Sequence, residues 1–124
     1  MRHFATVVIG GGAAGIMAAG VAASRGGNVL LCERMEKPQR KVRITGKGRC
    51  NLTNLCSEEE FLAKVRCGAD FFASALHRFD SEATMRFFER IGVPLTVERG
   101  RRVFPSSGKA WDIADAHVGW CRTQ

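Results

Sequence analysis

The sequence predicts an α/β fold, and three features of its first 33 residues carry this prediction. The apolar stretch Phe4–Ile9 is typical of a buried parallel strand. The glycine-rich stretch Gly10–Gly15 follows it directly and leads into a run of small residues that suits a helix. A second apolar stretch, Asn28–Cys32, ends at an acidic residue, Glu33. Strand, glycine turn, helix and strand in this order predict the β-α-β unit of a Rossmann-like domain.

The glycines follow the G-x-G-x-x-G pattern of dinucleotide-binding turns. Gly10 permits the tight turn, Gly12 lets the backbone approach a pyrophosphate, and Gly15 allows the helix to pack closely on the strand. We expect the helix over residues 13–25, with its free N–H groups and positive dipole end facing the phosphates. Gly26 and the glycine after it end the helix.

Glu33 stands about 20 residues after the glycines, where a carboxylate accepts hydrogen bonds from an adenosine ribose. Its charge disfavours the 2′-phosphate of NADP, although the neighbouring Arg34 weakens that argument. NAD and FAD both carry free ribose hydroxyls, so the motif alone leaves both open.

The stretch from Val7 to Ala23 carries no charge, which is also a feature of signal peptides and membrane spans. A span would be expected to contain more Leu, Ile and Phe and fewer glycines. Neither alternative explains the second strand or the position of Glu33, so we expect no membrane segment.

At 124 residues the chain is at most one domain, and its net charge is +7. The excess is concentrated in residues 34–49 and 99–102, which makes a basic nucleic-acid-binding module an alternative. The first cluster contains no aromatic residue that could stack on bases. An anionic cofactor or substrate is the simpler partner, and we expect no nucleic acid.

Five cysteines without a C-x-x-C pair indicate neither a zinc site nor a disulfide framework. Reduced thiols of this kind fit a cytoplasmic protein. The three histidines show no metal-ligand spacing, so we expect no metal.

Residues 37–56 read as a long connection with its own chemistry, in which Gly46 and Gly48 allow unusual backbone conformations. Arg49 offers a planar cation, and Asn51 and Thr53 offer hydrogen bonds. A loop of this length is usually functional or disordered, and a bound anion would order this one.

The pairing of V-V-I-G-G-G-A-A-G-I-M-A-A with R-K-x-x-I-T-G-K-G-R-C-N-L-T-N resembles the BaiN-like flavoproteins. That family is also labelled aminoacetone oxidase family FAD-binding enzymes, or NAD(P)/FAD-dependent oxidoreductases. The resemblance extends through F-D-S-E-A-T-M and R-G-R-R-V-F-P and covers essentially the whole chain. One departure is Gln39, where the family usually has glycine before Arg-Lys. This residue is expected to alter the turn that leads into the cofactor-contacting loop.

The resemblance implies FAD as the cofactor and an FAD-dependent oxidoreductase as the parent protein. By similarity, the segment after Glu33 would line the cofactor toward its flavin. The resulting cofactor-binding residues are Gly10, Gly12, Ala13, Ala14, Gly15, Glu33, Arg34, Arg40, Lys41, Thr45, Gly46, Gly48, Arg49 and Asn51. It also makes NAD(P)H a candidate electron donor for an unidentified small-molecule substrate. No residue stands out as an acid or base, so we name no catalytic residue.

The second half reads as helices and a short hairpin. Ser57 caps one helix, and Asp80 or Ser81 caps another that ends at Gly92. The phenylalanines of residues 71–88 are expected in the core. A hairpin is expected over residues 94–104, and a last helix, capped by Ser107, over residues 109–121 with Trp111 among its apolar residues.

We therefore interpret residues 1–124 as a partial FAD-binding domain, the N-terminal piece of a larger flavoenzyme. Residues 1–36 form the β-α-β unit, 37–56 the cofactor-contacting loop and 57–124 the helices and hairpin. Two parallel strands make an incomplete sheet, whose apolar residues lack some neighbours. The alternative is a non-catalytic remnant that binds an adenine dinucleotide.

Overall fold

The computed structural model describes residues 1–124. It begins with strand β1 (Thr6–Ile9), helix α1 (Ala13–Ser24) and strand β2 (Val29–Cys32). The two strands pair in parallel, with Thr6 opposite Val29 and Ile9 opposite Cys32. Gly26, at a φ of 84°, ends the helix, and the N–H groups of Gly26 and Gly27 donate back to carbonyls of its last turn. The predicted β-α-β unit is confirmed.

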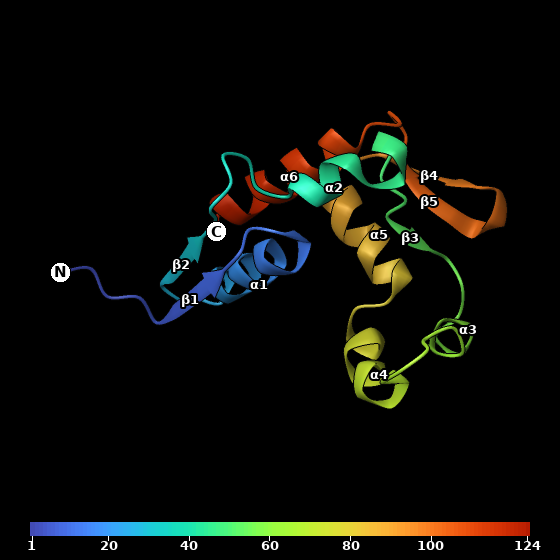
Figure 1. Ribbon diagram of the computed structural model, residues 1–124, viewed down its shortest axis with the longest axis horizontal. Helices are drawn as coiled ribbons and strands as arrows, with labels where there is room; N and C mark the ends of the chain where they lie inside the picture. The colour runs from blue at the N-terminus through green and yellow to red at the C-terminus, as the bar shows by residue number, and fades with distance from the viewer.

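The prediction of a buried first strand is wrong in part. β1 and β2 form a two-stranded sheet, and Ile9 is 80% exposed while Val7 is 54% exposed. Each strand therefore has one partner, and α1 packs against the sheet (Figure 1). The expectation that these apolar residues lack neighbours is correct.

Helix α6 (Ala110–Arg122) packs against α1 and connects the two halves of the molecule. Gly20 of α1 makes this approach possible, because a Cβ at that position would lie 2.3 Å from the ring of Trp120. Ile16 and Ala19 are buried in α1, as are Ala114 and Val118 in α6. In Figure 1 both termini lie at the end of the molecule that holds β1 and β2.

Residues 37–56 are not an irregular loop throughout. They contain helix α2 (Arg40–Ile44), the 3-10 turn η1 (Thr45–Gly48) and the short strand β3 (Thr53–Asn54). Three residues with side chains adopt left-handed backbone conformations here: Gln39, Lys47 and Cys50. Side chains disfavour that region, so the sequence pattern gave no sign of these turns.

Three helices follow: α3 (Glu58–Leu62), α4 (Ala69–Arg78) and α5 (Ser81–Arg90). The predicted caps at Ser57 and Asp80 are confirmed, since the Ser57 hydroxyl accepts from the Glu60 N–H and the Asp80 carboxylate from the Ala83 N–H. Phe87 and Phe88 are buried as expected. Phe71 is 92% exposed, and Phe72 and Phe79 are exposed as well, so the predicted place of these three residues in the core is wrong.

A second sheet has the antiparallel order β3-β5-β4, formed with strands β4 (Leu95–Glu98) and β5 (Arg102–Pro105). The turn η2 (Arg99–Arg101) joins β4 to β5, which confirms the predicted hairpin. The last helix begins after Lys109 rather than at a Ser107 cap, although the Ser107 hydroxyl accepts from the Lys109 N–H. The core of this half gathers Cys50, Phe87, Phe88, Val93, Ala110 and Ile113.

None of the helices is both long enough and apolar enough to cross a membrane.

Candidate functional site

A cavity of about 540 Å³ opens where β1 turns into α1. The glycine-rich turn forms one wall, and α2 with the residue after it forms the other. The lining residues are Ile9, Gly10, Gly12, Ala13, Ala14, Gly15, Gln39, Lys41, Val42 and Thr45. The structure thus brings together seven of the residues predicted to bind the cofactor, five from the turn and two, Lys41 and Thr45, from beyond β2.

Each motif glycine has a distinct physical reason to be glycine. Gly10 has a φ of 97°, which residues with side chains rarely adopt. A Cβ on Gly15 would lie 1.9 Å from the carbonyl oxygen of Gly10, so a side chain there would push the helix from the strand. A Cβ on Gly12 would meet nothing within 4 Å. Gly12 therefore leaves open space at the cavity, where a ligand can approach the backbone.

The start of α1 provides hydrogen-bond donors for an anion. Gly12 is the N-cap of α1, and no side chain caps the helix there. The N–H groups of a first helical turn have no acceptor within the helix, and the helix dipole favours negative charge at this end. This combination of open space and free donors fits the pyrophosphate of a dinucleotide.

Lys41 supplies a positive charge on the opposite wall. Its side chain is exposed, lines the cavity and takes part in none of the salt bridges of the structure. It is therefore free to pair with an anionic ligand. No carboxylate lines this cavity, so nothing there opposes a phosphate.

Glu33 lies directly after β2, beside the glycine-rich turn, as the sequence predicts. Its carboxylate accepts hydrogen bonds from the N–H of Gly11 at 2.6 Å and from the N–H of Met35 at 2.7 Å. These backbone bonds, the one from Met35 first, lower the pKa of Glu33 and keep it ionised at neutral pH. Each oxygen keeps a lone pair for another donor such as a ribose hydroxyl.

A second hollow, of about 690 Å³, adjoins the first. Glu33 and Arg34 line it together with Leu31 and Cys32, and it shares Ile9 and Gly10 with the first cavity. The two hollows therefore form one continuous surface around the end of the strands, which is where open α/β sheets bind their ligands.

Other predicted site residues lie elsewhere. Arg40 lines a separate hollow beside Trp111. Arg49 forms a salt bridge with Glu98 and lies over the ring of Phe104, 4.3 Å from its centre. Gly46 and Gly48 shape the turn η1, where a Cβ on Gly46 would lie 2.8 Å from the nitrogen of Asn51. These five line neither of the two hollows around Gly10, and their part in cofactor binding stays a prediction.

Gln39 is a lining residue that sequence reasoning treated only as a departure from a pattern. Its side chain is buried, and its N–H donates to the carbonyl of Gly11 at 2.8 Å. The signal was its place directly before Arg40 and Lys41, where the resemblance leads one to expect glycine. The structure gives Gln39 a φ of 59°, a value that glycine adopts readily.

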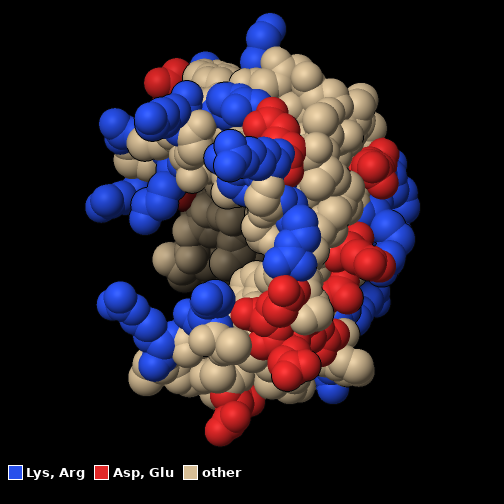
Figure 2. All heavy atoms as spheres, turned by 90° about the vertical axis from the view of Figure 1, so that its right-hand side faces the viewer, with Lys and Arg blue, Asp and Glu red and all other residues tan.

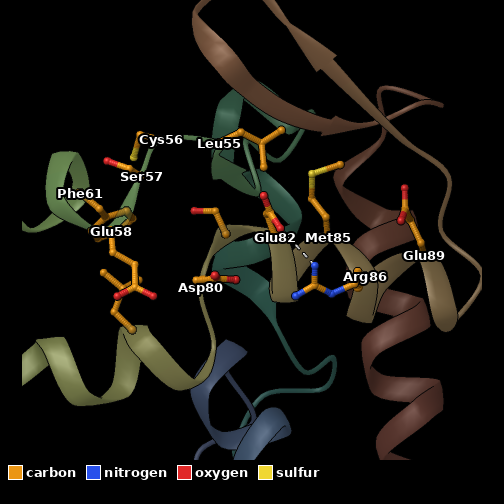
Figure 3. Close-up of a pocket in the computed structure, with 12 residues that line it drawn as sticks. Leu55, Cys56, Ser57, Glu58, Phe61, Asp80, Glu82, Met85, Arg86 and Glu89 are labelled. Carbon is orange, nitrogen blue, oxygen red and sulfur yellow. Dashed lines mark hydrogen bonds and ion pairs between the residues drawn. The ribbon is translucent and has the colours of Figure 1, made fainter.

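A further hollow of about 570 Å³ lies among α3, α4 and α5 (Figure 3). Four carboxylates line it, those of Glu58, Asp80, Glu82 and Glu89, against the single cation Arg86, which pairs with Glu82 at 3.2 Å. This charge disfavours an anionic dinucleotide, so the cavity beside Gly12 is the better candidate.

Comparison with known proteins agrees with this geometry. The family model described as "HI0933-like protein Rossmann domain" matches residues 4–124, which is nearly the whole chain. The chain belongs to the HI0933-like family. The matched description names a Rossmann domain, a dinucleotide-binding fold, so the resemblance noted in the sequence and the α/β class are confirmed.

Two curated relatives of this HI0933-like chain have described activities. A 3-dehydro-bile acid delta(4,6)-reductase of Clostridium scindens is 38% identical over 112 residues, which are 87% of this chain and 26% of the relative. A ribosomal RNA dihydrouridine synthase of Escherichia coli K12 is 42% identical over 79 residues, 64% of this chain and 19% of that relative. The chain thus spans about a quarter or less of the length of these relatives.

Proposed function

We propose that this chain is the FAD-binding part of a flavin-dependent reductase. The observation that carries the proposal is the cavity in which open space at Gly12 and the start of α1 face the cation Lys41, with Glu33 beside them. In this proposal the α1 N–H groups and Lys41 bind the pyrophosphate, and Glu33 accepts from the adenosine ribose. The Glu33 charge disfavours a 2′-phosphate, which supports FAD over NADP at this position.

Bound flavin would supply the hydride or electron-pair transfer, while the protein binds and orients it. The residues described here account for binding of the nucleotide half. Cys50 does not act as a redox partner of the flavin in this proposal, because it is a buried free thiol and burial raises its pKa to about 11. Its thiol therefore stays protonated and unreactive at neutral pH.

The names of the relatives support a class of reaction. One names a delta(4,6)-reductase and the other a synthase of dihydrouridine, and both terms describe the addition of hydrogen to a carbon–carbon double bond. We propose the same class of reaction for the protein to which these residues belong, with NAD(P)H as the electron donor.

The test compares alanine substitutions at two glycines that both have room for a Cβ atom. A Cβ on Gly12 or on Gly119 meets nothing within 4 Å, and neither glycine has a positive φ. Gly12→Ala fills the space at the cavity, so we expect it to weaken FAD binding at least about tenfold, which is 1.4 kcal/mol. Gly119→Ala lies in α6 and is the matched control. Titration of each variant with FAD, followed by flavin fluorescence, gives the dissociation constants.

Equal FAD affinity in the Gly12→Ala variant and the unsubstituted chain would contradict the placement of the pyrophosphate. Binding of ADP without any flavin binding would favour the non-catalytic dinucleotide-binding remnant instead.

A second candidate, action on RNA, is favoured by a specific observation. The first basic cluster contains no aromatic residue in sequence, but the fold brings Trp111 of α6 into it. Trp111 is 46% exposed, with the Lys37 nitrogen 4.8 Å and the Arg43 guanidinium 4.6 Å from its ring centre. Figure 2 shows Lys and Arg side chains around a hollow on one face of the molecule. Cations with an exposed aromatic ring suit single-stranded nucleic acid.

Trp111→Ala tests this candidate. If RNA contacts the cluster, we expect the variant to bind a single-stranded oligoribonucleotide about fivefold or more weakly, because a stacked base contributes on the order of 1–3 kcal/mol. Phe71→Ala, which removes an exposed aromatic ring on α4, is the control. An RNA affinity that stays the same in the Trp111→Ala variant, in the Phe71→Ala variant and at raised salt concentration would contradict the RNA candidate.

A further inference from the structure

The side chain of Gln39 connects three parts of the molecule. Gln39 is the N-cap of α2, and its carbonyl accepts from the N–H of Arg43 at 3.1 Å. Its own N–H donates to the carbonyl of Gly11 in the glycine-rich turn. Its side-chain amide reaches α6, where Nε2 lies 2.6 Å from Nδ1 of His117. Turn, α2 and α6 therefore meet at one residue.

The partner of Gln39 is itself held firmly. His117 is buried, stacks on Trp120 with ring centres 5.8 Å apart, and meets the edges or faces of Phe87 and Phe88. An imidazole surrounded in this way offers Nδ1 in one fixed direction. The bond from Gln39 therefore fixes the start of α2 relative to the core.

Two features of this arrangement destabilise the fold, and a residue that only filled space at position 39 would avoid both. Gln39 holds a φ of 59°, which side chains disfavour. Gln39 Oε1 and His117 Nε2 are both buried without a hydrogen-bond partner. Turning the amide over exchanges its two atoms and still leaves one of them unpartnered. Buried polar atoms of this kind destabilise a fold, so a small or apolar residue would serve better as mere filling.

We propose that Gln39 is a positioning residue for the cofactor site, whose bond to His117 holds α2 so that Lys41 and Thr45 face the glycine-rich turn. This inference rests on the proposed function, since it concerns the pyrophosphate end of the same cavity. Gln39 lines that cavity between Gly10 on one wall and Lys41 on the other. Arg43 of α2 also pairs with Asp115 of α6 at 2.6 Å, so loss of the Gln39 side chain loosens the start of α2 and leaves the glycine-rich turn itself intact.

The experiment compares Gln39→Gly with Gln124→Gly in the full chain. Glycine adopts the φ of residue 39 without strain, so Gln39→Gly removes the amide while sparing the backbone. Gln124 is an exposed glutamine at the end of the chain and serves as the control. Two ligands are titrated into each protein: ADP, which carries the pyrophosphate, and adenosine, which lacks it.

We expect Gln39→Gly to weaken ADP binding about five- to tenfold, the effect of one buried hydrogen bond, and to leave adenosine binding unchanged. Equal weakening of ADP binding and adenosine binding would show a general loss of structure and would overturn the positioning role. Unchanged ADP binding would overturn it as well.

A second readout does not depend on the cofactor. Trypsin cuts after Arg40, Lys41 and Arg43 in α2 and after Arg90 in α5. If Gln39 anchors the start of α2, we expect trypsin to cut α2 several times faster in the Gln39→Gly variant and to cut after Arg90 at an unchanged rate. If the unsubstituted chain binds neither ligand, the proposed function fails, and the cleavage rates alone decide whether Gln39 anchors α2. Equal cleavage of α2 in both proteins would then overturn the inference.

Discussion

At the scale of single residues, the buried pair of Gln39 and His117 makes stability depend on pH. Burial lowers the pKa of His117 to about 4, because the imidazolium would lose its hydration among Trp120, Phe87 and Phe88. In the unfolded chain the same group titrates near its ordinary value of 6.5. Between these two pH values the unfolded state binds a proton at His117 and the folded state does not. The contribution of this group to the free energy of unfolding is therefore complete above pH 6.5 and decreases as the pH falls toward 4.

This dependence can be measured with a matched variant. Urea unfolding at a series of pH values from 8 to 5 should show stability falling below pH 6.5 by up to about 1.4 kcal/mol per pH unit from this group. The double substitution Gln39→Leu and His117→Phe removes both the titrating ring and the unpartnered atoms, so its pH dependence should be shallower. His117→Phe alone leaves the amide of Gln39 without a partner and should cost about 1–3 kcal/mol. Parallel pH profiles for the unsubstituted chain and the double variant would refute this assignment.

At the scale of elements, the contact of α1 with α6 depends on one glycine. A Cβ at Gly20 would lie 2.3 Å from the Trp120 ring, and the ring itself packs edge-on against Phe87 with centres 4.8 Å apart. The ring cannot retreat without disturbing the core of the second half. Overpacking of this kind costs about 1–3 kcal/mol.

Gly20→Ala should therefore lower the free energy of unfolding by that amount, despite the better helix propensity of alanine. Gly119→Ala, on the open side of α6, should be neutral or slightly stabilising. Denaturant unfolding of both variants measures the difference. Equal stabilisation by the two alanines would mean that α1 and α6 do not pack as described.

The elements also show how far local sequence reasoning reaches. The β-α-β unit, the caps at Ser57 and Asp80 and the hairpin follow from patterns within a few residues, and the structure contains them. Strand β3 has two residues and exists only because Thr53 pairs with Val103, far along the chain. Helix α2 begins at a left-handed Gln39 that no local rule predicts.

At the scale of the whole molecule, the candidate site combines parts that are separate in sequence. The glycine-rich turn and Glu33 could be found from the motif, because its spacing reflects the geometry of one β-α-β unit. The contact of Gln39 with His117 joins residues 78 positions apart, and Trp111 enters the basic cluster only through the packing of α6 beside α2. Such contacts depend on tertiary packing, which local patterns do not encode.

We propose that the surface around Gly12, Lys41 and Glu33 binds FAD through its adenine-dinucleotide half. An absorbance spectrum of the purified chain, mixed with FAD and then freed of unbound cofactor, tests this binding. We predict that flavin bands remain with the protein and that excess ADP removes them, since both ligands share the pyrophosphate site. Folded protein that retains no flavin and shows no affinity for ADP would contradict the claim.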